Sequence, residues 1–299
     1  MNIYSQISSN KTKTWLIMFL FVIFITTILF VYGKASGYGL SYAGIGLIFS
    51  GIMVFSSYYY SDKMILGMSG AKQIKKADNP QLFRIVENLC IGAGTPLPKI
   101  YIIEDSAINA FATGRDPKHS VVCVTTGILG RLNRVELEGV IAHELSHVRN
   151  YDIRLMAIVV ILVGLVALLA DFFMRSLWYG GGRRRDDRGS SQSIFLLIGI
   201  AFAILSPIIA TLIQLAVSRK REFLADASGA LLTRYPEGLA SALEKISRDK
   251  EPLEAANNAT AHLYISNPFK LHANSKHWFT SLFNTHPPIA ERIKILRSM

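Results

Sequence analysis

Cysteine is scarce in this chain, with only Cys90 and Cys123 among 299 residues. Two cysteines are too few for a disulfide framework, so we expect both to be reduced, structural thiols in a cytosol-facing domain. The chain also lacks internal repeats, low-complexity tracts and basic stretches interleaved with aromatic residues, although its formal net charge is +11. No nucleic-acid partner is therefore expected.

Charge is missing from four long segments, and 51% of all residues are hydrophobic. Uncharged apolar stretches cover residues 15–32 and 155–170 and lie within residues 35–61 and 189–218. Each can supply the roughly 20 residues that a helix needs to cross a bilayer. Four such stretches argue against the alternative of buried core helices. We predict four transmembrane helices, the first being an uncleaved anchor because its apolar run is long for a cleaved signal.

Basic residues indicate the orientation of these spans. All but six of the 32 Lys and Arg residues lie in the N-terminus, residues 62–154 and residues 219–299, which four spans would place on one side. The cluster GGRRRDDRG at 181–189 argues the other way. By the positive-inside rule we place the large segments in the cytoplasm.

Local patterns predict a mixed fold for these large segments. A capping box, with Asn133 as cap and Glu136 three residues later, starts a helix that continues through His143 and His147. The tail is expected to be mostly helical. Helical periodicity marks residues 82–91, β-branched residues mark strands at 99–104 and 120–125, and residues 109–119 suggest a short strand followed by a turn at 114–117.

The stretch IAHELSHVRN, residues 141–150, contains the main chemical signal. His143 and His147 are four residues apart, so one helical face can offer both imidazoles to one metal ion. Glu144 lies beside that face, within reach of a water on the metal but not as a ligand. The alternative is a polar patch on a helix, but a buried bare pair of imidazoles and a carboxylate would be costly.

Zinc of this kind needs a third protein ligand. No other histidine has the H-x-x-G-x-x-H spacing of the metzincins. Glu222 and Asp226 are four residues apart in SRKREFLADASG, so one carboxylate can bind zinc while the other accepts the spare ring N–H of a ligand histidine. The alternative for Glu222 is a solvated charge beside Arg221. A tight hairpin of the last two spans would bring both helices out of the bilayer together, close above the membrane surface.

Three motifs, IAHELSHVRNYD, REFLAD and THPPIAERI, together with four spans, resemble the HtpX-type membrane metalloproteases of peptidase family M48. The resemblance covers nearly the whole chain. It implies an α-helical membrane protein with a mainly α, α+β zincin-like (gluzincin) domain and one Zn²⁺ per chain. His143, His147 and Glu222 would bind the zinc and Glu144 would be the catalyst. It further implies a bacterial inner-membrane quality-control and stress-response role, cleaving misfolded or damaged membrane proteins.

Two more candidates come from resemblance. NAFATG at 109–114 resembles the Asn-Ala-Phe edge strand of thermolysin-like zincins, which implies that Asn109 and Ala110 offer backbone groups to an extended substrate. The alternative is a plain turn at Asn109. His286, before two prolines at a helix start, resembles the family's histidine that donates to the oxyanion. The alternative for His286 is that it caps or packs at that helix start.

The predicted division of the chain is a membrane hairpin at 1–61, part of the metalloprotease domain at 62–154, a second hairpin at 155–218 and the rest of the domain at 219–299. Expected partners are unfolded or membrane-protein substrates and the lipid bilayer; no oligomeric state follows from the sequence. A zinc-stabilised membrane scaffold without proteolysis is a rival reading that the presence of Glu144 disfavours. A transporter or channel is disfavoured because only Asp171 places a charge near a span.

Overall fold

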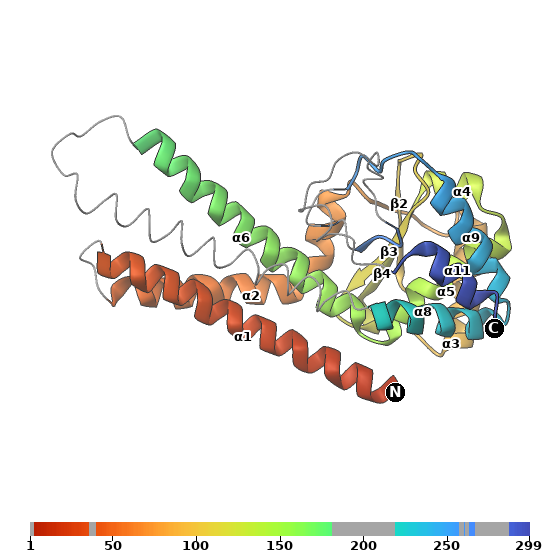
Figure 1. The fold of residues 1–299 in the computed structure, drawn as a ribbon, viewed down its shortest axis with the longest axis horizontal. Helices are drawn as coiled ribbons and strands as arrows, with labels where there is room; N and C mark the ends of the chain where they lie inside the picture. Colours follow the sequence, from red (N-terminus) through yellow and green to blue (C-terminus); the bar gives the residue numbers. More distant parts are fainter. Residues whose placement is uncertain (1–2, 36–39, 181–218, 257–259, 261–262, 267–286) are drawn as a thin grey trace.

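The computed structural model describes residues 3–35, 40–180, 219–256, 260, 263–266 and 287–299. Three long helices extend together from a domain that contains the sheet and the shorter helices (Figure 1). The long helices are α1 (Ile3–Ala35), α2 (Ser41–Met68) and α6 (Asp152–Gly180), and we call them the helical arm.

Two helices of the arm, α1 and α2, have the properties of membrane spans. Within the described part of the chain, Ser5–Val31 and Ser41–Met68 are long and apolar enough to cross a bilayer. Large apolar side chains point outward from these helices, for example Phe19 at 62% and Ile48 at 67% exposure. Such a surface is unfavourable in water but suits lipid.

The predicted spans map onto this arm in part. The first two fall on α1 and α2, and the third, residues 155–170, falls on α6. The fourth, residues 189–218, lies outside the described residues, and so does the loop 181–189. The count of four spans therefore stays a prediction.

The domain contains a four-stranded sheet in the order β1-β2-β4-β3. Its strands are β1 (Lys72–Gln73), β2 (Lys99–Ile103), β3 (Ala110–Gly114) and β4 (Ser120–Thr125). The strands β2 and β4 are parallel, and β3 pairs antiparallel with β4 at the edge. Three of these strands were predicted, and β1 was missed because it has only two residues.

Helices pack around this sheet. The predicted helix at 82–91 is α3 (Pro80–Ala93), and a 3-10 turn, Pro117–His119, precedes β4. The capping box is confirmed, because Asn133 and Glu136 exchange side-chain-to-backbone hydrogen bonds at the start of α5 (Arg134–Arg149). The other helices are α4 (Thr126–Arg131), α8 (Arg219–Thr233), α9 (Pro236–Arg248) and α11 (Ile289–Leu296).

Helix α5 lies at the centre of the domain and is buried from Gly139 through Val148. Two glycines let neighbouring helices approach it closely. A Cβ on Gly139 would lie 2.7 Å from the backbone nitrogen of Leu239 in α9. A Cβ on Gly229 of α8 would lie 3.0 Å from the backbone nitrogen of His143. The contact at Gly229 fixes how close α8 lies to α5 at His143, and the contact at Gly139 does the same for α9.

Candidate metal centre

Two histidines and a glutamate converge between α5 and α8. The Nε2 atoms of His143 and His147 are 3.2 Å apart. The Glu222 carboxylate lies 3.5 Å from His147 Nε2 and 3.8 Å from His143 Nε2. All three side chains are buried, so the alternative of a solvated Glu222 is wrong. These residues form a group that could hold a metal ion.

The spacing of these atoms fits a small tetrahedral metal ion. Ligands about 2.0–2.1 Å from a tetrahedral zinc lie about 3.3 Å from one another. The nitrogen–nitrogen separation of 3.2 Å is close to this value, and the carboxylate is slightly farther away. Two nitrogens and a carboxylate directed at one point are the ligand types that zinc prefers.

The outer nitrogen of each imidazole is held by a carboxylate. His143 Nδ1 is 2.9 Å from Asp226 Oδ1, and His147 Nδ1 is 3.0 Å from Asp152 Oδ2. A proton on each Nδ1 satisfies these contacts and leaves each Nε2 as a lone-pair donor directed at the common point. The sequence interpretation gave Asp226 this kind of role, but it missed Asp152.

Asp152 reaches His147 because the chain reverses sharply between α5 and α6. Tyr151 has a positive φ of 59°, an uncommon conformation for an aromatic residue. This turn places Asp152, the first residue of α6, beside the last turn of α5. The only sequence signal for this role is an aspartate five residues after His147 in HELSHVRNYD.

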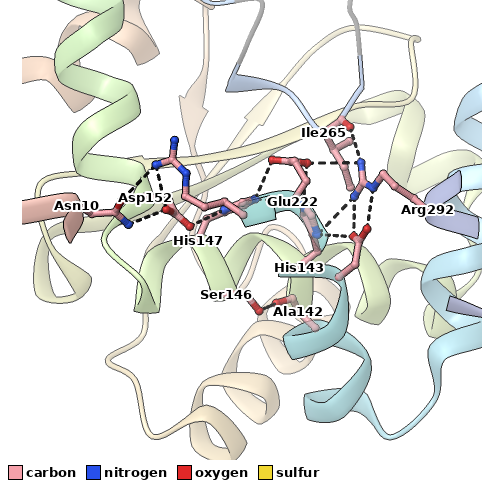
Figure 2. A network of polar contacts seen from close by, with 11 residues as sticks. Asn10, Ala142, His143, Ser146, His147, Asp152, Glu222, Ile265 and Arg292 are labelled. Atoms are coloured by element: carbon pink, nitrogen blue, oxygen red, sulfur yellow. Dashed lines mark hydrogen bonds and ion pairs between the residues drawn. The ribbon is translucent and has the colours of Figure 1, made fainter. Parts of the chain in front are cut away.

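The network continues on both sides of the histidines, as Figure 2 shows. Asn10 of α1 donates to Asp152 Oδ1 at 2.8 Å, and Arg221 of α8 lies 3.3 Å from the same oxygen. On the other side, Arg292 of α11 binds both oxygens of Asp226, at 2.7 and 2.8 Å, and lies 3.6 Å from Glu222. The sequence interpretation assigned no role at the metal centre to Asn10, Arg221 or Arg292, which lie far along the chain from the stretch that contains His143 and His147.

The charges of this cluster favour a divalent cation. Among the residues that the structure describes, its buried charged side chains are four carboxylates and two guanidinium groups, namely Glu144, Asp152, Glu222, Asp226, Arg221 and Arg292. With all of them ionised and both imidazoles neutral, two negative charges remain in excess. Buried charge without compensation is costly, so a doubly charged cation at the convergence point would stabilise the cluster.

Glu144 has the properties of a general base. Burial and the neighbouring Glu222 carboxylate raise the pKa of Glu144 to about 7, against the opposing effects of His147 and the Ala112 backbone N–H. Glu144 is only 2% exposed, and it follows His143 directly on α5. A carboxylate with a pKa near neutrality can take up and return a proton at physiological pH.

The protonation of the metal-free histidines differs between the two rings. Burial lowers the pKa of His143. Burial also disfavours charge on His147, but the hydrogen bond with Asp152 and the carboxylates of Glu222 and Glu144 outweigh it and raise the pKa of His147 to about 9. Without a metal, a proton on His147 thus partly replaces the cation.

The edge strand β3 lies beside the metal centre, because the Ala112 backbone N–H in the middle of this strand donates a hydrogen bond to Glu144. Asn109 is buried and continues the ladder, because its carbonyl accepts a hydrogen bond from the Thr125 N–H at 3.1 Å. The Ala110 carbonyl accepts a hydrogen bond from the Ile265 N–H at 3.0 Å. The Asn109 amide group lies 3.4 Å from the Ser266 carbonyl. Both residues that were predicted to bind substrate are therefore in contact with residues 265–266.

His286 lies outside the described residues. The next residue, Pro287, is buried, and α11 starts two residues later at Ile289. This helix carries Arg292 into the metal centre.

Comparisons with known proteins agree with this geometry. Residues 76–299 match the sequence model of peptidase family M48. The chain is 49% identical to a protease HtpX homolog of Dictyoglomus turgidum, with 99% of this chain and 94% of that protein covered. It is 46% identical to a protease HtpX homolog of Lactobacillus helveticus, with 99% and 100% covered.

A solved structure shares the fold. The crystal structure of Ste24p from S. mikatae superposes with a TM-score of 0.51 at 18% sequence identity. The alignment covers 98% of this chain and 66% of that protein. The family match, the extended identity to HtpX homologues and the helical arm together confirm the resemblance drawn from the motifs. This chain belongs to peptidase family M48 and is a membrane-associated metalloprotease of the HtpX type.

Proposed function

We propose that the protein is a zinc endopeptidase that hydrolyses unfolded, misfolded or damaged membrane proteins at the membrane surface. His143, His147 and Glu222 are the zinc ligands, and Glu144 is the general base. The observation that carries the proposal is the buried His-His-Glu convergence with Glu144 on the same helix. The protease domain in this proposal is assembled from residues 62–154 and 219–299, with membrane hairpins at 1–61 and 155–218.

The chemistry divides between the metal and the chain's own groups. When bound, zinc supplies Lewis acidity that activates water and polarises the scissile carbonyl. Glu144 accepts the proton of the attacking water and passes it to the leaving amine. Asp226 and Asp152 hold the two imidazoles in the orientation that leaves both Nε2 atoms free to bind the metal. His286 donates a hydrogen bond to the oxyanion.

Substrate binds in this proposal as an added strand on the outer edge of β3, the edge that does not face β4. The Ala110 carbonyl faces that edge, and its present partner is the Ile265 N–H. A substrate N–H would take over this hydrogen bond. Main-chain recognition of this kind depends little on side chains, which suits broad specificity for unfolded segments.

The location of the site supports a membrane substrate. Asn10 of α1 and Asp152 of α6 both belong to the helical arm and reach His147 through hydrogen bonds. The metal centre is therefore joined directly to the helices that would leave the bilayer. We place the protein in the bacterial inner membrane with the protease domain in the cytoplasm, as the distribution of basic residues indicates.

The test is a cleavage assay with the purified full chain and an unfolded membrane-protein substrate. Cleavage should stop after treatment with a zinc chelator and return when one equivalent of zinc is added. A protein that retains its fold only with zinc but never cleaves would instead be the alternative, a zinc-stabilised membrane scaffold.

A further inference from the structure

A polar cavity lies where β3 ends and the chain turns into β4. It has a volume of about 390 Å³, within the range of roughly 300–1,000 Å³ that is typical of ligand sites. Its walls come from the end of α2, the start of β2 and the turn between β3 and β4. The side chains that matter here are Tyr59, Tyr60, Lys63, Lys99, Arg115 and Lys118.

The cavity carries a strong excess of positive charge. Three lysines and one arginine line it, against the single carboxylate of Asp62. Asp116 lies just outside the lining and pairs with Arg115 at 3.6 Å and with His119 at 2.8 Å. Lys63, Lys99 and Lys118 make no ion pair with any residue that the structure describes, and all three are exposed. An anionic ligand would supply the missing charge.

Aromatic rings contact two of these cations. Lys63 Nζ lies 5.3 Å from the centre of the Tyr60 ring, and the Arg115 guanidinium lies 5.1 Å from that of Tyr59. Both tyrosines are exposed, at 43% for Tyr59 and 46% for Tyr60. Tyrosine and lysine or arginine together are typical of the boundary between lipid tails and water.

The position of the cavity along α2 identifies the source of the anion. Twenty residues of helix, about 30 Å, separate the start of α2 from Tyr60, which is the thickness of the hydrocarbon core. If α2 crosses the bilayer, the tyrosines and the cavity lie at the level of the phosphates. Basic pockets at this level bind anionic lipid headgroups.

We propose that this cavity binds the headgroup of an anionic phospholipid, and that Lys63, Lys99, Arg115 and Lys118 contact its phosphate. This inference rests on the membrane placement in the proposed function, but it does not depend on proteolysis. A bound lipid would join α2 to the β3–β4 turn and so fix the height of the protease domain above the bilayer.

The experiment uses the full chain in neutral detergent and measures binding of a short-chain phosphatidylglycerol by native mass spectrometry. Wild-type protein should bind one molecule tightly, and should bind phosphatidylcholine of the same chain length at least about tenfold more weakly. The double variant Lys63→Gln/Lys118→Gln should lose about 25-fold in affinity, at about fivefold for each lysine near a lipid surface. The matched control Lys250→Gln/Lys294→Gln removes two exposed lysines elsewhere in the domain and should bind like wild type.

Three results would overturn the proposal. These are equal affinity for the two lipids, unchanged binding by Lys63→Gln/Lys118→Gln, and binding of inorganic phosphate as tight as that of the lipid. The assay contains no protein substrate, so its outcome is separate from that of the cleavage assay.

Discussion

Asp226 and Glu222 lie on one face of α8 but have different tasks at the metal centre. Glu222 faces both Nε2 atoms, whereas Asp226 contacts His143 Nδ1 and Arg292. With Glu222 as the proposed third ligand, Glu222→Ala should lower zinc content and activity together. Asp226→Ala leaves all ligands in place and should weaken zinc affinity by roughly 10–100-fold. Zinc quantification in the purified variants distinguishes the two, and full zinc occupancy in Glu222→Ala would refute its assignment as a ligand.

Zinc binding should also depend on pH through His147. The pKa of this ring is raised to about 9 without metal, so the ring carries a proton at neutral pH that zinc must displace. Zinc affinity should therefore rise about tenfold per pH unit from pH 6 to 8 and level off near pH 9. Competition with a chelator of known affinity measures the zinc affinity at each pH.

Asp152→Asn provides the control for this pH dependence. It removes the charged partner that raises the pKa of His147, so its affinity should level off at a lower pH. A pH-independent zinc affinity in the wild type would show that His147 is neutral before the metal binds.

Single residues were predictable where helix geometry alone relates them. The spacing of four residues fixes His143 with His147 on one face, and likewise Glu222 with Asp226. Asp152 was missed because its role needs the left-handed backbone at Tyr151, which local propensity does not predict. Arg292 was missed because its contact with Asp226 spans 66 residues of sequence and depends on the tertiary fold.

Among the elements, the packing of α8 on α5 determines whether Glu222 reaches the histidines. Gly229 allows this approach, since a Cβ there would lie 3.0 Å from the backbone nitrogen of His143. Gly229→Ala should push α8 outward, lower the stability by about 1–3 kcal/mol and weaken zinc binding. Thermal unfolding and zinc titration measure these effects.

Gly130→Ala is the matched control for this substitution. A Cβ at Gly130 of α4 meets no atom within 4 Å, so the change should be neutral or slightly stabilising. If Gly229→Ala unfolds and binds zinc like Gly130→Ala, the close contact of α5 and α8 is not what positions Glu222.

Strong local patterns predicted the individual elements well. Apolar periodicity gave α3, β-branched runs gave β2 and β4, and a capping box gave the start of α5. The short elements β1 and α4 were missed because two and six residues carry little periodicity. The strand order could not be predicted, since local sequence does not say that β4 lies between β2 and β3.

At the scale of the whole molecule, the helical arm and the protease domain share one polar network. Asn10 of the first long helix and Arg292 near the C-terminus both lie within two contacts of a histidine. The absence of charge predicted the apolar part of this arm, because charged side chains are costly inside a bilayer. That absence could not predict Asn10, a polar residue before the first apolar run whose partner, Asp152, is 142 residues away.

The most direct test of the account is the comparison of wild type with Glu144→Gln, each purified as the full chain with bound zinc. The substitution keeps the shape of the side chain and removes the base, so the variant should retain its zinc, its fold and its membrane association. Cleavage of an unfolded membrane-protein substrate should fall at least roughly 10²-fold, the lower range for loss of general acid–base assistance. Equal cleavage rates for the two zinc-loaded proteins would contradict the account, because Glu144 would then not be the base.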